Sequence, residues 1–531
     1  MSNRRELNTK ASGVVAVAVM CSRVLGLIRE ILFAGLFGSA LMGIFTIAFR
    51  APNLLRDLFA EGALSTAFIT VFSQRIEQEG NRSAWLLASK MMTLVAIFMS
   101  AISLCGVVFA EQLISLLAPG FAPRDAKLTV QLTQIMYPFI LLVSLSALVM
   151  GLLNARNVFG VPAMASSFFN IGSIAGGVLF GWWFDPAFGE KALAGLAVGT
   201  LVGGFLQLVV QLPSLRRVGY RFRPDFRWND PGIRKILLLM VPSVIAASAV
   251  QINVVVNSSF ASFVGKEAVS WLNFAFRLMQ LPIGVFGVAV ATITLPVVSR
   301  IAAHTDRSEF GPTLGRALRL AVFLTLPSAV GLFFLAQPII GVIYQRGEFT
   351  ATDTLQTGFA LQFYALGLVS YACIKVLSPA FYAIDKKWTP MWVSFAAIGL
   401  NFCLNYILIL KLGFGHQGLA LATSLSASAN FLALYVLMHG HAETLETRRL
   451  LGALGRCGLA SVALGMVCWL GQMYGDPWLE GSSILPKIIV LFGVIVCAGA
   501  TYLLICFALG VEEVTTFGRA LAAKFLRRAN V

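Results

Sequence analysis

Long apolar runs dominate this chain and limit what it can fold into. A helix needs about 20 predominantly apolar residues to cross the roughly 30 Å hydrocarbon core of a bilayer, and a scan for such runs finds about fourteen. They lie at residues 13–36, 41–72, 84–110, 130–153, 160–183, 192–213, 236–263, 269–298, 317–344, 355–383, 388–411, 417–438, 452–474 and 484–511. Each run exceeds the roughly 9–11 residues of a transmembrane strand. We therefore predict an all-α polytopic membrane protein with about 14 transmembrane helices.

Composition supports this class and argues against others. Of 531 residues, 58% are hydrophobic and only 12% are charged, against about 25% charged residues in soluble domains. The net charge is +16, but the basic residues lie between apolar runs and form no basic domain, so we expect no nucleic-acid partner. The chain has no C-x-x-C pair, P-loop, G-x-S-x-G or H-E-x-x-H motif. We therefore expect a protein that is not an enzyme and holds no cofactor.

Alternate loops differ in charge. One set of loops holds most of the Lys and Arg, including the basic segment 214–235, whereas the opposite set holds few, such as Arg124, Lys127 and Lys191. Cytoplasmic loops of membrane proteins carry the excess of Lys and Arg. The pattern predicts a multi-pass protein with both termini in the cytoplasm.

Short strings recur about 227 residues apart. Ala48-Phe49-Arg50 returns as Ala275-Phe276-Arg277, and Leu142-Val143-Ser144 returns as Leu368-Val369-Ser370, while Gly120 matches Gly347 and Pro162 nearly matches Pro390. Agreement in order and spacing indicates an internal repeat. We predict two parallel, pseudo-symmetric six-helix lobes, 1–213 and 236–441, joined by a cytoplasmic linker at 214–235. Residues 442–531 would add helices 13 and 14 and a basic tail. Parallel halves are a known transporter plan.

Charged residues inside the apolar runs need an explanation, because each costs about 2.5–3.5 kcal/mol at a helix centre. They are Arg23, Arg29, Arg50, Arg56, Lys90, Arg277 and Lys375. Lys90 lies near a helix end and is expected to extend its side chain to the membrane interface, and Lys375 can be explained either that way or as part of a site. The arginines lie deeper in their runs, which favours a site in the bundle interior.

Two arginine pairs in the first two runs are each followed by an acid. Arg23 and Arg29 precede Glu30, and Arg50 and Arg56 precede Asp57, with Glu61 four residues further on. The acids can simply neutralise neighbouring arginines, but positive charge is left over. Guanidinium groups bind phosphate oxygens bidentately, so we predict an anionic, phosphorylated substrate. Pro52 and the Phe59–Gly62 sequence FAEG should break the second helix beside a cavity.

Several strings resemble the MurJ (MviN) family of lipid II flippases in the MOP superfamily. They are SRVLGLIRE at 22–30, PNLLRDLFAEGALSTAF at 52–68, APGF at 118–121, RLMQLPIGVFGVA at 277–289 and KVLSPAFYA at 375–383. The resemblance implies alternating-access export of undecaprenyl-pyrophosphate disaccharide-pentapeptide across the bacterial inner membrane for peptidoglycan synthesis. It implies a substrate site at Arg23, Arg29, Arg56 and Arg277, to which we add Arg50, Glu61 and Lys375. Helices 13 and 14 would hold the lipid tail in a groove.

The resemblance also bears on coupling. Asn257, Asn401, Asn405 and Thr423 match a sodium site of some family members, although interhelical hydrogen bonds explain these residues equally well. Sodium ion and membrane potential are both candidate energy sources. Gly43 and Phe276 stand where relatives often have acids, so charge balance in the cavity is in question.

Other functions remain alternatives. A multidrug or cation antiporter of the same superfamily would need intramembrane carboxylates without Arg neighbours, and none is evident. A flippase for another polyprenyl-pyrophosphate glycan would need the same arginines as a lipid II flippase. A membrane-embedded glycan ligase would need a large external loop, and every such loop is short. Expected partners are lipid II and membrane lipids, with other cell-wall synthesis proteins as candidates and the monomer as the expected state.

Overall fold

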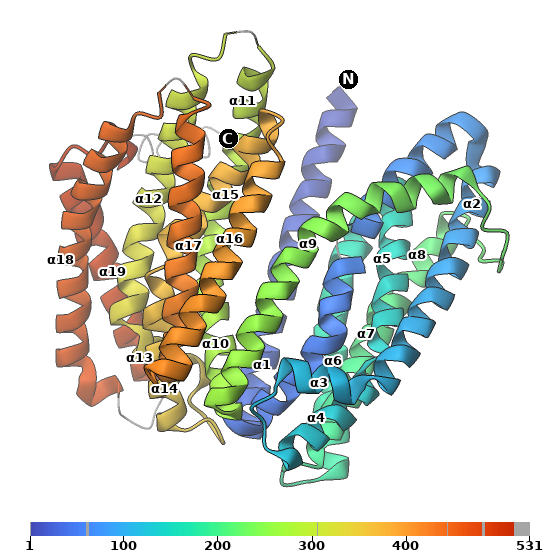
Figure 1. Cartoon of the computed structure of the whole chain (residues 1–531), viewed down its shortest axis with the longest axis horizontal. Helices are drawn as coiled ribbons and strands as arrows, with labels where there is room; N and C mark the ends of the chain where they lie inside the picture. Colours follow the sequence, from blue (N-terminus) through green and yellow to red (C-terminus); the bar gives the residue numbers. More distant parts are fainter. Residues whose placement is uncertain (1, 60–62, 305, 443, 480–483, 515–531) are drawn as a thin grey trace. The chain divides into compact units, whose positions relative to one another are not determined.

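The computed structural model describes residues 2–59, 63–304, 306–442, 444–479 and 484–514, and these residues form helices and connecting loops without a strand. Contacts divide the chain into two compact units. Unit 1 comprises residues 1–270 together with 346–349, and unit 2 comprises 271–345 and 350–531. The predicted all-α class is confirmed (Figure 1).

Unit 1 contains nine helices among its described residues. They are α1 (Ser2–Phe59), α2 (Ala63–Val108), α3 (Ala110–Leu117), α4 (Pro123–Met136), α5 (Phe139–Ala155), α6 (Gly160–Phe184), α7 (Ala192–Val209), α8 (Leu212–Arg217) and α9 (Pro231–Val264). In the described part of unit 2 the order is α10 (Lys266–Pro282), whose first turn belongs to unit 1, η1 (Ile283–Gly287, a π-helical turn), α11 (Val288–Ala303), α12 (Phe310–Phe334), α13 (Ala336–Tyr344), α14 (Ala351–Ala365), α15 (Leu368–Ala383), α16 (Trp388–Asn405), η2 (Tyr406–Lys411, π-helical), α17 (Gly415–His439), α18 (Thr447–Leu479) and α19 (Ile484–Ala508).

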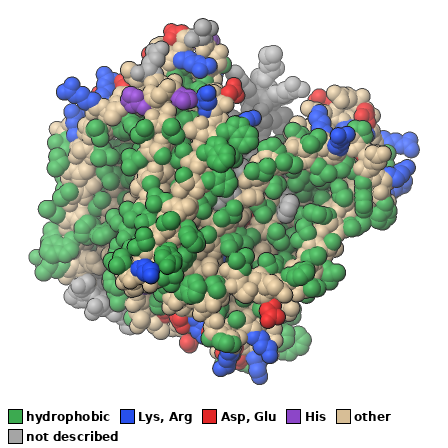
Figure 2. Space-filling view, in the orientation of Figure 1, with side chains coloured by type: hydrophobic (Ala, Val, Ile, Leu, Met, Phe, Trp, Pro, Cys, Tyr) green, Lys and Arg blue, Asp and Glu red, His purple; other side chains and the backbone are tan. Residues whose placement is uncertain are grey.

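The number of membrane crossings agrees with the sequence. Within the described residues, 11 helices are long and apolar enough to cross a bilayer, or 13 when two bent helix pairs each count as one span. Gly38 (φ 67°, ψ 177°) and Gly80 (φ 83°, ψ 175°) each interrupt a long helix, α1 and α2 respectively. The 11 to 13 spans are close to the predicted number of about 14. On the face seen in Figure 2, hydrophobic side chains cover the middle of the helices and most charged side chains gather near helix ends. This is the surface of a multi-pass membrane protein.

The internal repeat is confirmed by the positions of helix ends. Gly38 and Gly265, which are 227 residues apart, both have positive φ and both follow a long helix. The short helix α3 matches α13, and the pair α4 and α5 matches the pair α14 and α15 at nearly the same offset. A left-handed backbone is readily adopted by glycine alone, so the chain turns at the same point in each repeat.

Reciprocal contacts explain why unit 1 includes part of the second repeat. The Glu348 amide donates a hydrogen bond to the Gly35 carbonyl at 2.8 Å, and the Gly120 amide donates to Ser262 Oγ at 3.0 Å. Gly35 and Ser262 are equivalent positions, as are Gly120 and Gly347. Each repeat therefore places its loop on the first helix of the other repeat, and the sequence border of the repeats differs from the border of the compact units.

The expected break at Pro52 is wrong. The helix α1 continues through Pro52 to Phe59, and residues 60–62, which hold the rest of the FAEG sequence and Glu61, lie outside the described residues. Proline deprives the carbonyl four residues earlier of its helical partner. Here the Thr133 hydroxyl of α4, which donates to the Thr129 carbonyl of its own helix at 2.8 Å, also lies 3.3 Å from the Ala48 carbonyl and shares its single proton between the two. Gly38 lies at the junction between the predicted runs 13–36 and 41–72, so it is not the break expected within the second run.

Unit 2 contains a similar hydrogen bond to a carbonyl that a proline leaves without its helical partner. Pro327 lies inside α12, and the carbonyl that it deprives, that of Phe323, accepts a hydrogen bond from the Tyr502 hydroxyl of α19 at 2.8 Å. A hydroxyl from a neighbouring helix therefore keeps a proline-containing helix intact in both units.

Buried ion pairs hold the ends of several helices. Arg319 of α12 pairs with Glu446, which precedes α18, at 2.6 Å and with Glu513, which follows α19, at 3.0 Å. The hydrogen bond from Arg319 lowers the pKa of Glu446. These pairs join the last two helices to α12, and a buried pair of this kind is costly to break.

Parts of the predicted linker are helical, and its Asp230 side chain makes several contacts. Residues 214–217 belong to α8 and residues 231–235 form the start of α9, whose first turn is capped by the Asp230 side chain. Asp230 also pairs with Arg75 Nη1 at 2.6 Å and with Lys90 Nζ at 2.8 Å. The Lys90 side chain therefore extends toward the linker, where a buried carboxylate holds its ammonium group, and its expected position at the membrane interface stays a prediction.

The Asp230 pairs generate a prediction about stability and pH. Burial alone would raise the pKa of Asp230, but hydrogen bonds from Lys90, Arg75 and the Gly232 amide outweigh it and hold the pKa below its usual range. A carboxyl with a lowered pKa stabilises the fold above its ordinary pKa of about 4 and loses that effect as the pH falls through the folded value. Asp230→Asn should therefore lower stability by about 1.5–3 kcal/mol at neutral pH, and the deficit should shrink below about pH 4.

Thermal unfolding of the purified protein at several pH values measures this deficit. Asp306→Asn, which removes an exposed loop carboxylate bonded to Ser308, is the matched control and should leave the Tm unchanged. A deficit of equal size at all pH values would show that the stabilisation does not depend on the ionised Asp230 carboxylate.

Candidate substrate-binding site

Four of the predicted site residues lie on α1. Arg23 and Arg29 precede Gly38, and Arg50 and Arg56 follow it. At 1.5 Å per residue, Arg29 and Arg50 lie about 14 and 18 Å from Gly38 along their segments, and Arg23 and Arg56 about 22 and 27 Å. The arginines are therefore evenly spaced in distance from Gly38, with steps of about 4.5 Å. Arg277 of α10 and Lys375 of α15 belong to unit 2, and Glu61 lies outside the described residues.

The second segment of α1 makes two polar contacts with α9. Arg50 donates from Nη1 to Ser258 Oγ, and the Gln251 amide donates to Asp57 Oδ2 at 3.4 Å. The contacts are seven residues apart on each helix, as expected for antiparallel neighbours. Arg50 is therefore positioned by α9, a contact that sequence reasoning missed because a serine or glutamine in an apolar run carries no partner signal.

Arg56 and Asp57 form an ion pair with an N–O distance of 3.0 Å. Asp57 also accepts a hydrogen bond from Asn53 at 3.5 Å. The interpretation that Asp57 neutralises a neighbouring arginine is confirmed for Arg56. Both side chains remain partly exposed, at 22% and 29%, so the pair is accessible to a ligand.

The first segment of α1 presents its arginines differently. The Arg29 guanidinium lies 5.2 Å from the centre of the Phe169 ring of α6, a distance typical of a cation–π contact. Glu30 beside it is 6% exposed, whereas Arg23 is exposed. The Arg29 guanidinium is therefore positioned against an aromatic ring in the interior of unit 1.

The charged residues of the two repeats are unequal. Arg50 and Arg277 are equivalent at the 227-residue offset, but the positions equivalent to Arg23, Arg29 and Arg56 are Val250, Val256 and Ile283. Arg277 and Lys375 are both exposed within unit 2. The first repeat therefore supplies most of the positive charge.

The two positions where relatives often have acids have structural explanations. A Cβ on Gly43 would lie 1.8 Å from the Lys266 carbonyl oxygen, so α1 and the start of α10 approach too closely there for any side chain. The Phe276 ring meets the Tyr364 ring edge-on, with centroids 5.3 Å apart. Both positions are used for packing in this chain.

The residues of the candidate sodium site are polar but uncharged. Asn401 and Asn405 of α16 are buried, and the Asn405 amide donates to Asn401 Oδ1 at 3.1 Å. The Thr423 hydroxyl of α17 donates to the Leu419 carbonyl at 2.8 Å, and Asn257 lies in unit 1. Oxygen donors suit a hard cation, but the set contains no carboxylate to balance its charge.

Comparison with known proteins identifies the class. A solved structure described as "Lipid II flippase MurJ, inward closed conformation" matches 92% of this chain and 98% of its own at 28% identity, with a TM-score of 0.73. An inward-facing multidrug resistance MATE family transporter of the MOP superfamily shares the fold, at 16% identity and a TM-score of 0.67, over 82% of this chain and 98% of its own. The architecture is that of a polytopic membrane transporter.

Sequence comparison gives the family. The profile described as "Lipid II flippase MurJ" matches residues 33–490. A "Probable lipid II flippase MurJ" of Vibrio cholerae is 34% identical over 95% of this chain and 96% of its own length, and a "Lipid II flippase MurJ" of Burkholderia cenocepacia is 35% identical over 78% and 81%. The chain belongs to the MurJ lipid II flippase family. Its relatives are named as flippases, not as enzymes.

The buried asparagines generate a test that separates cation binding from helix packing. If they bind sodium, sodium should raise the Tm more than potassium does, Asn401→Ala should abolish the difference, and Asn405→Asp should enlarge it by supplying the missing negative charge. Thermal unfolding in matched chloride salts measures each effect. Equal Tm values in both salts for all three proteins would assign these residues to packing.

Proposed function

We propose that the protein moves lipid II from the inner to the outer leaflet of the bacterial cytoplasmic membrane by alternating access. Membership of the MurJ family is the observation that carries this proposal. Lipid II, membrane lipids and the candidate contacts with other cell-wall synthesis proteins are its partners in this view, and the protein acts as a monomer.

The arginines supply the chemistry that such transport needs. A pyrophosphate that leaves water loses its hydration, and burying an ion without partners is very costly. Guanidinium groups replace water with two parallel charge-assisted hydrogen bonds each. The arginines spaced along α1 would give the pyrophosphate successive partners. Arg277 would contribute from the second repeat, and Lys375 would add positive charge.

The contacts suggest different roles for these arginines. Arg50 is held by Ser258 and Arg56 by Asp57, so a pyrophosphate would have to displace or share those contacts. Arg29 rests on an aromatic face and Arg23 is exposed. We infer that Arg23 makes the first contact with the substrate, and that Arg29 and Arg56 bind it only by exchanging the contacts that they already make.

Lysine substitutions test whether the site needs fork geometry or charge alone. Arg29→Lys and Arg277→Lys keep the charge but lose bidentate binding, and each lost charged hydrogen bond is worth about 1.5–3 kcal/mol. Both variants should fail to restore growth to a flippase-depleted strain, with inner-leaflet lipid II accumulating in a leaflet-specific assay. Arg124→Ala, which removes an exposed arginine paired with Glu190, is the matched control and should restore growth.

Membrane-fraction levels must be equal for this comparison. Growth with Arg277→Ala would remove the phosphate-clamp mechanism, and growth with lysine but not with alanine would leave a charge requirement only. Accumulation of a different polyprenyl-pyrophosphate glycan on depletion would assign another cargo to the same site.

The topology in this proposal places both termini and the 214–235 linker in the cytoplasm. Single cysteines at Arg221 and Ala187, both exposed, test it in a cysteine-free background with an impermeant maleimide on intact cells. Ala187→Cys should be labelled, and Arg221→Cys should be labelled only after the membrane is opened. Labelling of Arg221→Cys in intact cells would reverse the orientation.

A further inference from the structure

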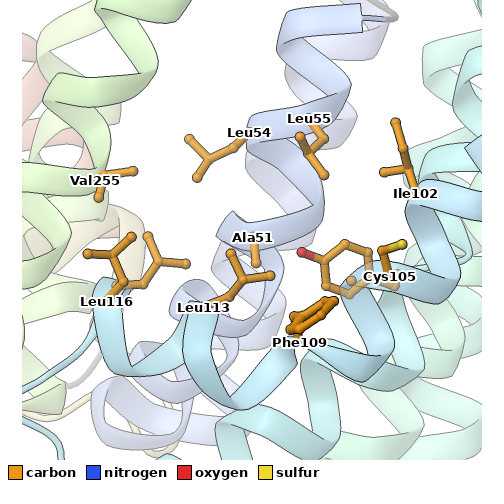
Figure 3. A pocket seen from close by; sticks show the side chains of 12 residues that line it. Ala51, Leu54, Leu55, Ile102, Cys105, Phe109, Leu113, Leu116 and Val255 are labelled. Carbon is orange, nitrogen blue, oxygen red and sulfur yellow. The ribbon is translucent and has the colours of Figure 1, made fainter.

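Unit 1 contains a cavity of about 350 Å³ with an apolar lining. Its volume falls within the roughly 300–1,000 Å³ of small-molecule sites. The lining side chains include Ala51, Leu54 and Leu55 of α1, Ile102 and Cys105 of α2, Leu113 and Leu116 of α3, and Val255 of α9 (Figure 3). Four helices of one unit therefore line a partly open cavity suited to hydrocarbon.

Polar contacts on both sides hold this space open. The Arg50 contact with Ser258 and the Asp57 contact with Gln251 join α1 to α9 about one turn before and one turn after Leu54 and Val255. Between them, Leu54 and Val255 point toward each other across the cavity (Figure 3). The two helices are tied together by polar groups while their apolar side chains leave a gap.

One polar group lines this apolar cavity. Tyr137 is 1% exposed and belongs to the lining. Among the described residues no side-chain hydrogen bond uses its hydroxyl, which is not fully enclosed by protein atoms and opens into the cavity. A polar group without a partner is costly in an apolar environment. The hydroxyl is therefore a donor positioned for an acceptor on a bound molecule.

A glycine makes room for the tyrosine. A Cβ on Gly106 would lie 2.0 Å from Tyr137 Cε1, so the ring packs directly on the backbone of α2. The equivalent position in the second repeat is Phe333. The fold does not require glycine there, so this arrangement is specific to the first repeat.

We propose that this cavity binds an acyl chain of a membrane glycerophospholipid and that Tyr137 donates a hydrogen bond to its ester carbonyl. The lining accepts a hydrocarbon chain, and the ester supplies the acceptor that the hydroxyl needs. A polyprenyl chain offers no acceptor along its length, so the hydroxyl favours the phospholipid. The site uses none of the arginines and does not rest on the proposed transport function.

Photo-crosslinking in nanodiscs tests the site with the full-length protein. A phosphatidylethanolamine with a diazirine in its acyl chain should label peptides that contain α3. Leu116→Trp should fill the cavity and abolish that labelling, and Tyr137→Phe, which keeps the ring, should lower it roughly two- to tenfold, the effect of one hydrogen bond. Leu104→Trp makes the same change on a residue that is 66% exposed and outside the lining, and should leave labelling unchanged.

A second set of nanodiscs, with a diazirine-bearing polyprenyl phosphate, separates the two sources of hydrocarbon. Weaker labelling of α3 by this probe, unaffected by Tyr137→Phe, is expected. Labelling of α3 that survives both Leu116→Trp and Leu113→Trp would overturn the site. Stronger labelling by the polyprenyl probe, or phospholipid labelling unaffected by Tyr137→Phe, would overturn the assignment of the occupant. Leu113→Trp fills the same cavity and replaces Leu116→Trp if the latter does not accumulate in the membrane.

Discussion

A backbone carbonyl inside a bilayer has no water to bond, and much of this structure follows from that constraint. Helices satisfy it internally except where proline removes a donor. At Pro52 and Pro327 the freed carbonyls of Ala48 and Phe323 accept hydroxyls from Thr133 and Tyr502. In each case a side chain from a neighbouring helix supplies a donor to the freed carbonyl. Each proline-containing helix therefore depends on its packing against a neighbour.

Symmetry in the backbone coexists with asymmetry in charge. Turns at Gly38 and Gly265 and the reciprocal loop contacts of Gly120 and Gly347 repeat at one offset, as expected for a duplicated scaffold. The charged groups do not all repeat, because Arg23, Arg29 and Arg56 correspond to valine or isoleucine in the second repeat. The duplicated backbone is therefore combined with unequal charge at the candidate site positions.

Features that follow from the pattern of residues along the chain could be predicted from the sequence. Contacts between residues far apart in the chain could not. Long apolar runs predicted the helices, and the repeated strings predicted the duplication. Nothing in the sequence indicates that Asp230 of the linker holds Lys90, or that the Lys266 backbone leaves no room beside Gly43. Pro52 was misread for the same reason, since its effect depends on Thr133 in another helix. Candidate arginines were identifiable by their cost in a membrane, but their individual contacts were not.

Those contacts change how the arginine cluster can work. A set of four identical free guanidinium groups would bind a pyrophosphate tightly at one position and would hinder release. Here Arg50 is bonded to Ser258, Arg56 is paired with Asp57 and Arg29 rests on Phe169, so each arginine gives up a different contact when it binds an anion. These competing contacts reduce the net free energy gained when the substrate binds each arginine. The substrate need therefore not be held too tightly at any one position along α1. Moderate binding at several positions is what conduction of a charged group through a low-dielectric space requires.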